Sequence, residues 1–271
     1  MKALENVKVL DLTVALSGPF CTQILAAQGA EVITIDPPGG GYQAKLFATT
    51  PIDLQRMMNG SLFANKKGVT INLKSDKGRD LVLKLAEMAD VVVSNFSPGT
   101  MDKLGLSYEE IHKINPRAVY CVISGFGQNG PLKNRPAYDP IIQAMTGLMS
   151  LNGYADRDPM PLPGAIGDIA AAIYAAFGIM AALHARDTLT GEGQFVDKVY
   201  TPSLWCIELY QREGVFYEAR AENYLFTSKS AGCCRVRGSR FSYVLGGSQP
   251  EGSGCCLHRA AAAHLLRAER L

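Results

Sequence analysis

Short apolar runs alternate with segments of helical spacing along most of the chain. An apolar run bounded by turn residues is typical of a buried strand, and apolar positions three and four apart are typical of a helix. Strand, helix and strand in succession predict parallel pairing, so an α/β domain with a parallel sheet is expected. The expected strands are Val7–Leu12, Glu31–Asp36, Val69–Leu73, Asp90–Ser94, Ala118–Ser124 and Gln194–Lys198.

Turns and helices are expected between these strands. The pattern predicts a turn at Ser17–Pro19, an irregular polar stretch over Gln43–Leu62, and a helix over Lys77–Met88 that begins at Ser75. The core-facing side of that helix is expected to carry Leu81, Leu83, Leu85 and Ala86. The other expected helices are Phe20–Ala27, Met101–Leu104, Tyr108–Ile114, Pro140–Leu151 and Leu204–Glu213.

The longest apolar segment is Gly164–Leu183, GAIGDIAAAIYAAFGIMAAL, whose only charge is Asp168. A helix that is apolar on all sides is expected to be buried, and this one is expected to be too short to span a bilayer. Asp168 lies where the helix begins, so it is either an N-cap or a carboxylate nucleophile in a partly buried setting. The local sequence alone favours the N-cap.

Composition excludes several classes of function. The chain has 271 residues, with 27 Lys and Arg against 25 Asp and Glu, and this net charge of +2 gives no reason to expect a nucleic-acid or membrane partner. Its first residues lack the apolar region of a signal peptide, so a cytoplasmic enzyme is expected. The first strand–helix–strand unit has no G-x-G-x-x-G motif, so the dinucleotide fingerprint is absent.

The seven cysteines fall into two groups. Cys21, Cys121 and Cys206 are solitary and are expected to be buried as small hydrophobic residues. The other four lie in the basic segment Ala231–Leu271, where adjacent pairs lack the two-residue gap that lets both thiolates reach one zinc ion. No metal site is therefore expected among Cys233, Cys234, Cys255, Cys256, His258 and His264.

Seven stretches in order resemble the class III CoA-transferases, the family that includes formyl-CoA transferase, carnitine CoA-transferase and α-methylacyl-CoA racemase. These stretches are KVLDLTVALSGPF, GAEVITID, NKKGVTINLK, VVVSNFSPGTMDKLGL, INPRAVYCVISGFGQNGP, AYDPIIQAMTGLM and GDIAAAIYAAFGIMAALHARDTLTGEGQ. The resemblance implies a Rossmann-like large domain over residues 1–225, with a CoA thioester bound as substrate at the strand ends and no tightly bound cofactor. It also implies a homodimer of interlocked chains.

The family's nucleophile falls on Asp168, and the resemblance thereby overturns the N-cap interpretation. It implies that Asp168 attacks an acyl-CoA, that CoA then forms a thioester with the aspartyl group, and that a small carboxylic acid takes the CoA away. A carboxylate suits this chemistry because it is both nucleophile and leaving group. The CoA contacts implied by the matching motifs are Ala15, Ser17, Asn72, Lys74, Asn95, Phe96, Ser97, Lys103, Ala137 and Tyr138.

Two departures from the family pattern bear on the chemistry. The segment Asp36–Pro38 offers no cation where many members have a basic residue for a CoA phosphate, and Arg135 is a candidate replacement. The racemase branch has His then Asp after the GFGQ loop, but this chain has Tyr138 and Asp139. A phenol with a pKa near ~10 is a poor proton shuttle, so a transferase is favoured over a racemase.

No family motif is found after about Phe226. The family's small C-terminal domain is therefore expected to be missing or replaced by an aberrant tail over 226–271 that is not a domain. This tail is either the product of a shifted reading frame or a real basic extension, with a strand over Phe241–Leu245 and a helix over Ala260–Glu269 expected within it. An alternative to the transferase is accordingly an incomplete, catalytically impaired chain that only binds CoA.

Overall fold

The computed structural model describes residues 2–40, 51–153 and 157–200, and three strands within 225–245. The chain divides into two compact units, Met1–Cys206 and Ile207–Leu271, which are described separately below. The boundary expected after residue 225 stays a prediction.

The first unit contains a six-stranded sheet with the order β3-β2-β1-β4-β5-β6, in which every pairing is parallel. The strand order reverses where β1 lies between β2 and β4, and ligands of open α/β sheets bind outside the strand ends at such a point. The parallel sheet is confirmed, with one expected strand beginning three residues earlier, at Lys66 instead of Val69. The strands are β1 (Lys8–Leu12), β2 (Glu31–Asp36), β3 (Lys66–Thr70), β4 (Val91–Ser94), β5 (Val119–Ser124) and β6 (Phe195–Val199).

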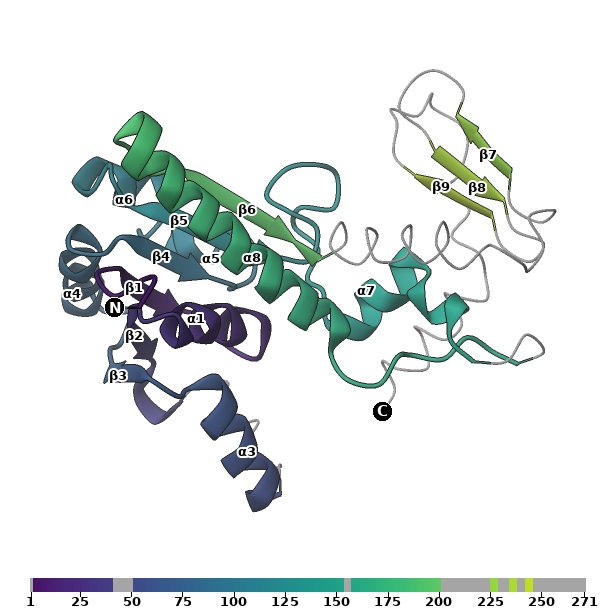
Figure 1. Cartoon of the computed structure of the whole chain (residues 1–271), viewed down its shortest axis with the longest axis horizontal. Coiled ribbons are helices and arrows are strands. Elements are labelled where there is room, and N and C mark those ends of the chain that lie inside the picture. The colour runs from purple at the N-terminus through teal and green to yellow at the C-terminus, as the bar shows by residue number, and fades with distance from the viewer. Residues whose placement is uncertain are drawn as a thin grey trace. The chain divides into compact units, whose positions relative to one another are not determined.

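Helices connect and cover these strands (Figure 1). The helices α1 and α8 pack against each other, and α8 also contacts β5 and β6. A core cluster forms where α4 and α6 meet Leu10, Val92 and Tyr120 of the three central strands. The helices are α1 (Ser17–Ala27), α3 (Ile52–Leu62), α4 (Asp76–Glu87), α5 (Thr100–Lys103), α6 (Tyr108–Ile114), α7 (Asp139–Thr146) and α8 (Ile166–Ala185), with short turns η1 (Pro38–Gly40), η2 (Leu148–Leu151) and η3 (Arg186–Thr190).

Two local predictions are wrong, and a third is wrong at one residue. Ser17–Pro19 is the first turn of α1 and not a separate turn, since proline is tolerated there because its missing N–H is not needed. Residues 52–62 of the stretch expected to be irregular form α3, and residues 43–50 of that stretch lie outside the described residues. Of the core-facing side expected for α4, Ala86 is buried and Leu83 and Leu85 pack partly buried against the core, whereas Leu81 is 53% exposed. Gly78 and Val82 complete the buried face.

The central helix α8 is buried on one side only. Its buried side consists mainly of alanines, which allow α1 to approach closely. The opposite side leaves Ile173, Tyr174, Phe177 and Met180 exposed, so the expectation of burial all round is wrong. Together with the next turn, Ile166–Thr190 is long and apolar enough to cross a membrane by length and composition, which corrects the expectation that it is too short. Half of its 18-residue apolar window is buried inside the protein.

A buried ion pair ties together the elements next to the β1 end. Lys66 Nζ lies 3.1 Å from Asp11 Oδ2, and both side chains are almost fully buried. The same ammonium donates to Thr22 Oγ1 at 2.7 Å and to the Pro19 carbonyl at 2.8 Å. The pair therefore joins β1, α1 and β3, and it supports the loop that follows β1.

The second unit is described only by three strands, β7 (Leu225–Ser228), β8 (Cys234–Arg237) and β9 (Ser242–Leu245), which form an antiparallel sheet in this order. The strand expected over Phe241–Leu245 is confirmed from residue 242. The helices expected over Leu204–Glu213 and Ala260–Glu269 lie outside the described residues, as does Cys206. Cys21 and Cys121 are buried thiols, as predicted.

Candidate active site

A cavity of about 550 Å³ lies at the carboxyl ends of β1, β4 and β5. This is the edge of the sheet where the strand order reverses, and therefore the place where an α/β sheet is expected to bind its ligand. It is lined by described residues from the end of β5, the loops after β1, β4 and β5, the start of α8 and the residue after β6. They are Val14, Ala15, Leu16, Asn95, Phe96, Ser97, Pro98, Thr100, Ile123, Ser124, Gly125, Arg135, Pro136, Ala137, Tyr138, Ala165, Asp168 and Tyr200.

Asn95 holds the loops after β1 and β4 together. Its Oδ1 accepts a hydrogen bond from the Val14 N–H at 2.8 Å, and its Nδ2 donates to the Val14 carbonyl at 2.7 Å. The next residue, Ala15, has a φ of +63°, which side chains with a Cβ rarely adopt. Backbone conformations of this kind cost about 1–3 kcal/mol and persist where neighbours fix them, as Asn95 does here.

Asp168 is the third residue of α8 and does not cap it. The N-cap position is Ala165, and the Gly167 N–H donates instead to Asp139 Oδ1 at 2.5 Å. The second oxygen of Asp139 accepts from Gln143 Nε2, also at 2.5 Å. Asp139, which lies in α7, accepts the Gly167 N–H in the first turn of α8. The side chain of Asp168 is therefore not needed as an acceptor there and lines the cavity instead. The N-cap interpretation of Asp168 is therefore wrong.

The Asp168 carboxylate receives hydrogen bonds from Tyr200, which follows β6, and from Ser17, at the start of α1. The Tyr200 hydroxyl donates to its Oδ1 at 2.8 Å, and the Ser17 hydroxyl contacts the Tyr200 hydroxyl. Burial raises the pKa of Asp168 above its ordinary value, and the nearby charge of Asp139 acts in the same direction. Hydrogen bonds from Tyr200 and from the side chain and backbone of Ser17 oppose this rise in pKa. The result is a carboxylate whose basicity is raised but whose charge is still supported by donors.

Tyr200 is the site residue that the sequence analysis missed. It directly follows β6, so its place at a strand's carboxyl end was a usable signal. Burial, followed by the charge of Asp168, raises the pKa of the Tyr200 phenol well above its ordinary value. The phenol therefore stays protonated and acts as a donor to Asp168.

The structure gathers most of the expected contact residues. Six of them line the cavity, and Ser17 lies against Asp168 at the start of α1. Asn72 and Lys74 lie in the loop after β3, and Lys103 ends α5; none of these three lines the cavity. Tyr138 is 65% exposed, so it lies at the rim. The lining set is Ala15, Asn95, Phe96, Ser97, Ala137 and Tyr138.

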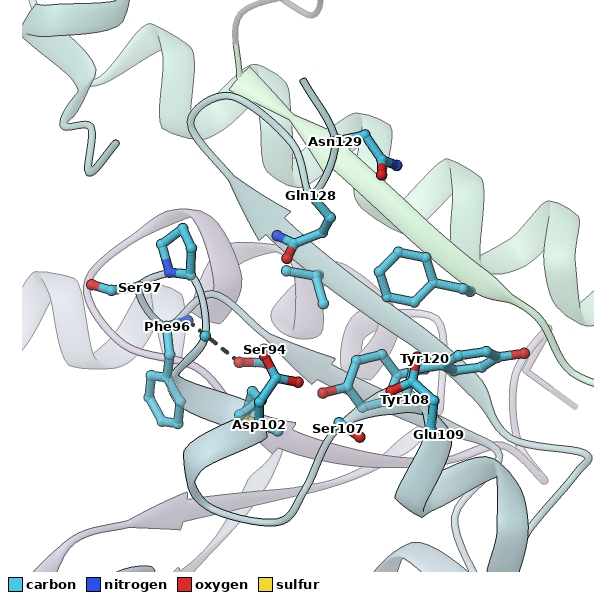
Figure 2. A pocket seen from close by; sticks show the side chains of 15 residues that line it. Ser94, Phe96, Ser97, Asp102, Ser107, Tyr108, Glu109, Tyr120, Gln128 and Asn129 are labelled. Atoms are coloured by element: carbon cyan, nitrogen blue, oxygen red, sulfur yellow. Dashed lines mark hydrogen bonds between the residues drawn. The ribbon is translucent and has the colours of Figure 1, made fainter. Parts of the chain in front are cut away.

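A second cavity of about 340 Å³ lies next to the first and shares Phe96, Ser97 and Pro98 with it. Figure 2 shows Tyr108 and Tyr120 on one side of it and Phe96 and Ser97 on the other. The rings of Tyr120 and Phe195 stack at 5.9 Å, and the Tyr120 hydroxyl donates to the Leu106 carbonyl at 2.8 Å. Asp168 does not reach this space, whose aromatic wall is part of the core packing.

Within the part of the chain that the structure describes, no group of three or more His, Cys, Asp or Glu side chains could hold a metal ion. The residues of the zinc alternative lie outside the described residues except for Cys234, of which only the strand is described.

Residues 4–211 match the CoA-transferase family III, and the chain belongs to this family. It is 42% identical over 197 residues to the succinyl-CoA:glutarate CoA-transferase of Mus musculus, an alignment that covers 73% of this chain and 45% of the relative. It is 41% identical over 194 residues to the acetyl-CoA:oxalate CoA-transferase of Acetobacter aceti, covering 71% of this chain and 49% of the relative. The chain thus spans about half the length of the curated relatives it matches.

Solved structures of similar proteins show the same fold. A CAIB/BAIF family protein from Brucella suis superposes with a TM-score of 0.73 at 31% identity, covering 86% of this chain and 67% of that one. A hypothetical protein from Mycobacterium tuberculosis superposes with a TM-score of 0.70 at 29% identity, covering 84% and 62% of the two chains. The Rossmann-like parallel sheet is therefore confirmed as the large-domain fold of this family.

Proposed function

We propose that this chain transfers coenzyme A from an acyl-CoA donor to a carboxylic acid acceptor, with Asp168 as the covalent nucleophile. The observation that carries this proposal is a half-buried carboxylate of raised pKa, held by Tyr200 and Ser17, at the strand-end cavity. A raised pKa makes the carboxylate more basic, and its partial burial removes water that would compete with the acyl group.

The transfer proceeds in steps that conserve every atom. An oxygen of Asp168 attacks the acyl carbonyl carbon, the C–S bond breaks, and CoA leaves as a thiolate from the mixed anhydride. The thiolate then adds to Cγ of Asp168 and expels the donor's carboxylate, which leaves an aspartyl-CoA thioester. The acceptor carboxylate attacks this thioester, and the thiolate it releases attacks the acceptor's acyl carbon. Asp168 is regenerated as the carboxylate.

The residues around Asp168 suit the thioester end of CoA. Asn95 fixes the loop that contains Ala15, and Phe96 gives an apolar wall for the pantetheine chain. Asn72, Lys74 and Lys103 lie outside the cavity and are proposed as contacts for the distant phosphates, where lysine charge favours binding.

Arg135 is the cationic side chain among the described residues that line the cavity, and it is exposed. The names of several relatives give glutarate, D-citramalate and oxalate as substrates, and each of these is a dicarboxylic acid. We propose a dicarboxylate acceptor whose second carboxylate, or a CoA phosphate, pairs with Arg135.

An acyl-CoA racemase is the second enzyme to consider. It needs two groups that exchange an α-proton, and the residues in the relevant loop are Tyr138 and Asp139. Both oxygens of Asp139 are occupied by Gly167 and Gln143, so this carboxylate is committed to structure. Incubation of a 2-methylacyl-CoA in deuterated water should leave the α-hydrogen in place. Rapid α-deuterium incorporation without an acceptor would favour the racemase.

The transferase proposal is tested by mixing the full chain with succinyl-CoA and isotope-labelled glutarate or oxalate. Formation of labelled acyl-CoA that depends on Asp168 supports it, whereas CoA binding without transfer favours an incomplete CoA-binding chain. We also propose that the chain works in the cytoplasm as a homodimer. The exposed apolar side chains of α8 support association with a second copy.

A further inference from the structure

The hydroxyls of Tyr200 and Ser17 form a chain of contacts that ends on one oxygen of Asp168. Tyr200 donates to Oδ1 at 2.8 Å, and the Tyr200 and Ser17 hydroxyls contact each other. Asn95 Nδ2 lies 3.2 Å from Ser17 Oγ, so the chain of contacts is anchored on the loop after β4. Residues from three regions that are distant in the sequence therefore form one chain of contacts, in which Tyr200 makes the hydrogen bond to Oδ1.

We propose that Tyr200 is a catalytic residue that donates to Oδ1 and stabilises the negative charge formed there when Cγ of Asp168 is attacked, with Ser17 as the residue that positions it. This inference rests on the proposed function, and it assigns different tasks to the two oxygens of Asp168. Oδ2 is the nucleophile that forms the anhydride, and Oδ1 remains the carbonyl oxygen throughout.

The electron flow supports this division. When the CoA thiolate adds to Cγ, the C=O electron pair moves onto Oδ1, and the Tyr200 O–H donates to that oxyanion without giving up its proton. The electron pair on Oδ1 then re-forms the Cγ=Oδ1 double bond, the Cγ–Oδ2 bond of the anhydride breaks, and the donor leaves as a carboxylate. The acceptor's attack on the thioester places charge on Oδ1 in the same way, but expels the thiolate. A fixed donor at an oxyanion needs no rearrangement during the reaction.

The setting of the phenol fits this task. Tyr200 is buried, and burial together with the charge of Asp168 raises the pKa of its hydroxyl, so the donor stays protonated across the neutral range. Removing one donor to an oxyanion slows a reaction by roughly 10²–10³-fold in other enzymes. The step at the acyl carbon of the donor does not use Oδ1 as an oxyanion, so it is expected to be much less affected.

To test this, the full chain is mixed rapidly with succinyl-CoA and quenched in acid. The mass of the intact protein is then measured by mass spectrometry. The anhydride adds the mass of the succinyl group, whereas the thioester adds that of CoA. In Tyr200→Phe, conversion of anhydride to thioester should slow by roughly 10²-fold, so the anhydride should accumulate. Ser17→Ala should produce the same shift to a smaller extent, because Tyr200 loses its neighbour but keeps its hydroxyl.

Tyr120→Phe is the matched control, because it removes another buried phenol that donates to a carbonyl, that of Leu106, away from Asp168. It should lower stability slightly and leave the ratio of anhydride to thioester unchanged. Equal conversion rates in Tyr200→Phe and in the wild type would overturn the role of Tyr200 and leave the transferase intact. Absence of both adducts in the wild type would overturn the proposed function itself, and this inference with it.

Discussion

The carboxylate of Asp139 accepts the backbone N–H of Gly167 at 2.5 Å, one residue before the candidate nucleophile. A donor in the first turn of α8 is thereby satisfied from a residue 28 positions earlier in the sequence. The contact fixes the helix start that carries Asp168, and it also brings a second negative charge near it, which raises the pKa of Asp168.

Asp139→Ala is expected to destabilise the protein by about 2 kcal/mol, because the Gly167 N–H and the Gln143 amide lose their buried acceptor. It should also lower the pKa of Asp168 by removing a neighbouring charge. Chemical denaturation measures the first effect. Asp80→Ala, which removes an exposed partner of Arg79, is the control and should change stability by less than about 0.5 kcal/mol. Equal changes in the free energy of unfolding of the two variants would show that the hydrogen bonds accepted by Asp139 do not stabilise the protein.

The stability of the protein should depend on pH through Asp168. Burial raises the pKa of this carboxyl in the folded state, so the folded protein holds its proton to a higher pH than the unfolded chain does. The contribution of Asp168 to stability is therefore largest below the ordinary Asp pKa of about 3.9 and is lost as the pH rises through the raised value.

Asp168→Asn removes this titration. The free energy of unfolding of the variant, minus that of the wild type, should increase across this pH window and then level off. Urea denaturation of both proteins at a series of pH values measures it. A difference that stays flat or decreases with pH would show that the folded-state pKa is not raised.

The buried pair of Lys66 and Asp11 should matter far more than its surface neighbour. Lys66→Met leaves Asp11 charged and buried without its cation, and such a change costs about 3–5 kcal/mol. Lys67→Met, in the same strand, breaks only the exposed pair with Glu31 and should cost less than about 1 kcal/mol. Thermal and urea denaturation compare the two, and similar losses would contradict the structural role of the buried pair.

The sequence predicted the sheet well because parallel strands covered on both faces are continuous apolar runs, such as Val91–Ser94 with all four residues buried. It also placed Asp168 at the start of the most apolar helix. The turn assigned to Ser17–Pro19 failed because Gly and Pro signal turns in most contexts, yet both fit the first turn of a helix. The exposed side of α8 could not be predicted, since its composition is apolar all round.

The role of the residues around Asp168 could not be derived from spacing. Tyr200 and Asp168 are 32 residues apart and Ser17 and Tyr200 are 183 apart, so only the folded sheet brings their side chains together. Asp139 was noticed only as the neighbour of Tyr138, because a carboxylate that caps a helix from another element leaves no local pattern.

The apolar stripe of Ile173, Tyr174, Phe177 and Met180 on α8 should promote self-association. Phe177 is the most exposed of the four, at 65%, so Phe177→Glu should shift the chain toward smaller species in sedimentation velocity experiments. Glu87→Ala, on the separate helix α4, is a control that should not change the distribution. An unchanged distribution in Phe177→Glu would show that this stripe is not an association surface.

The most direct test of the central claim is to identify the residue that becomes acylated. The full chain is incubated with succinyl-CoA, trapped with hydroxylamine, digested, and sequenced by mass spectrometry. We expect a hydroxamate on Asp168 in the wild type and none in Asp168→Asn, with circular dichroism confirming that the variant is folded. A hydroxamate on another carboxylate, or undiminished labelling of Asp168→Asn, would contradict the assignment of Asp168 as the nucleophile.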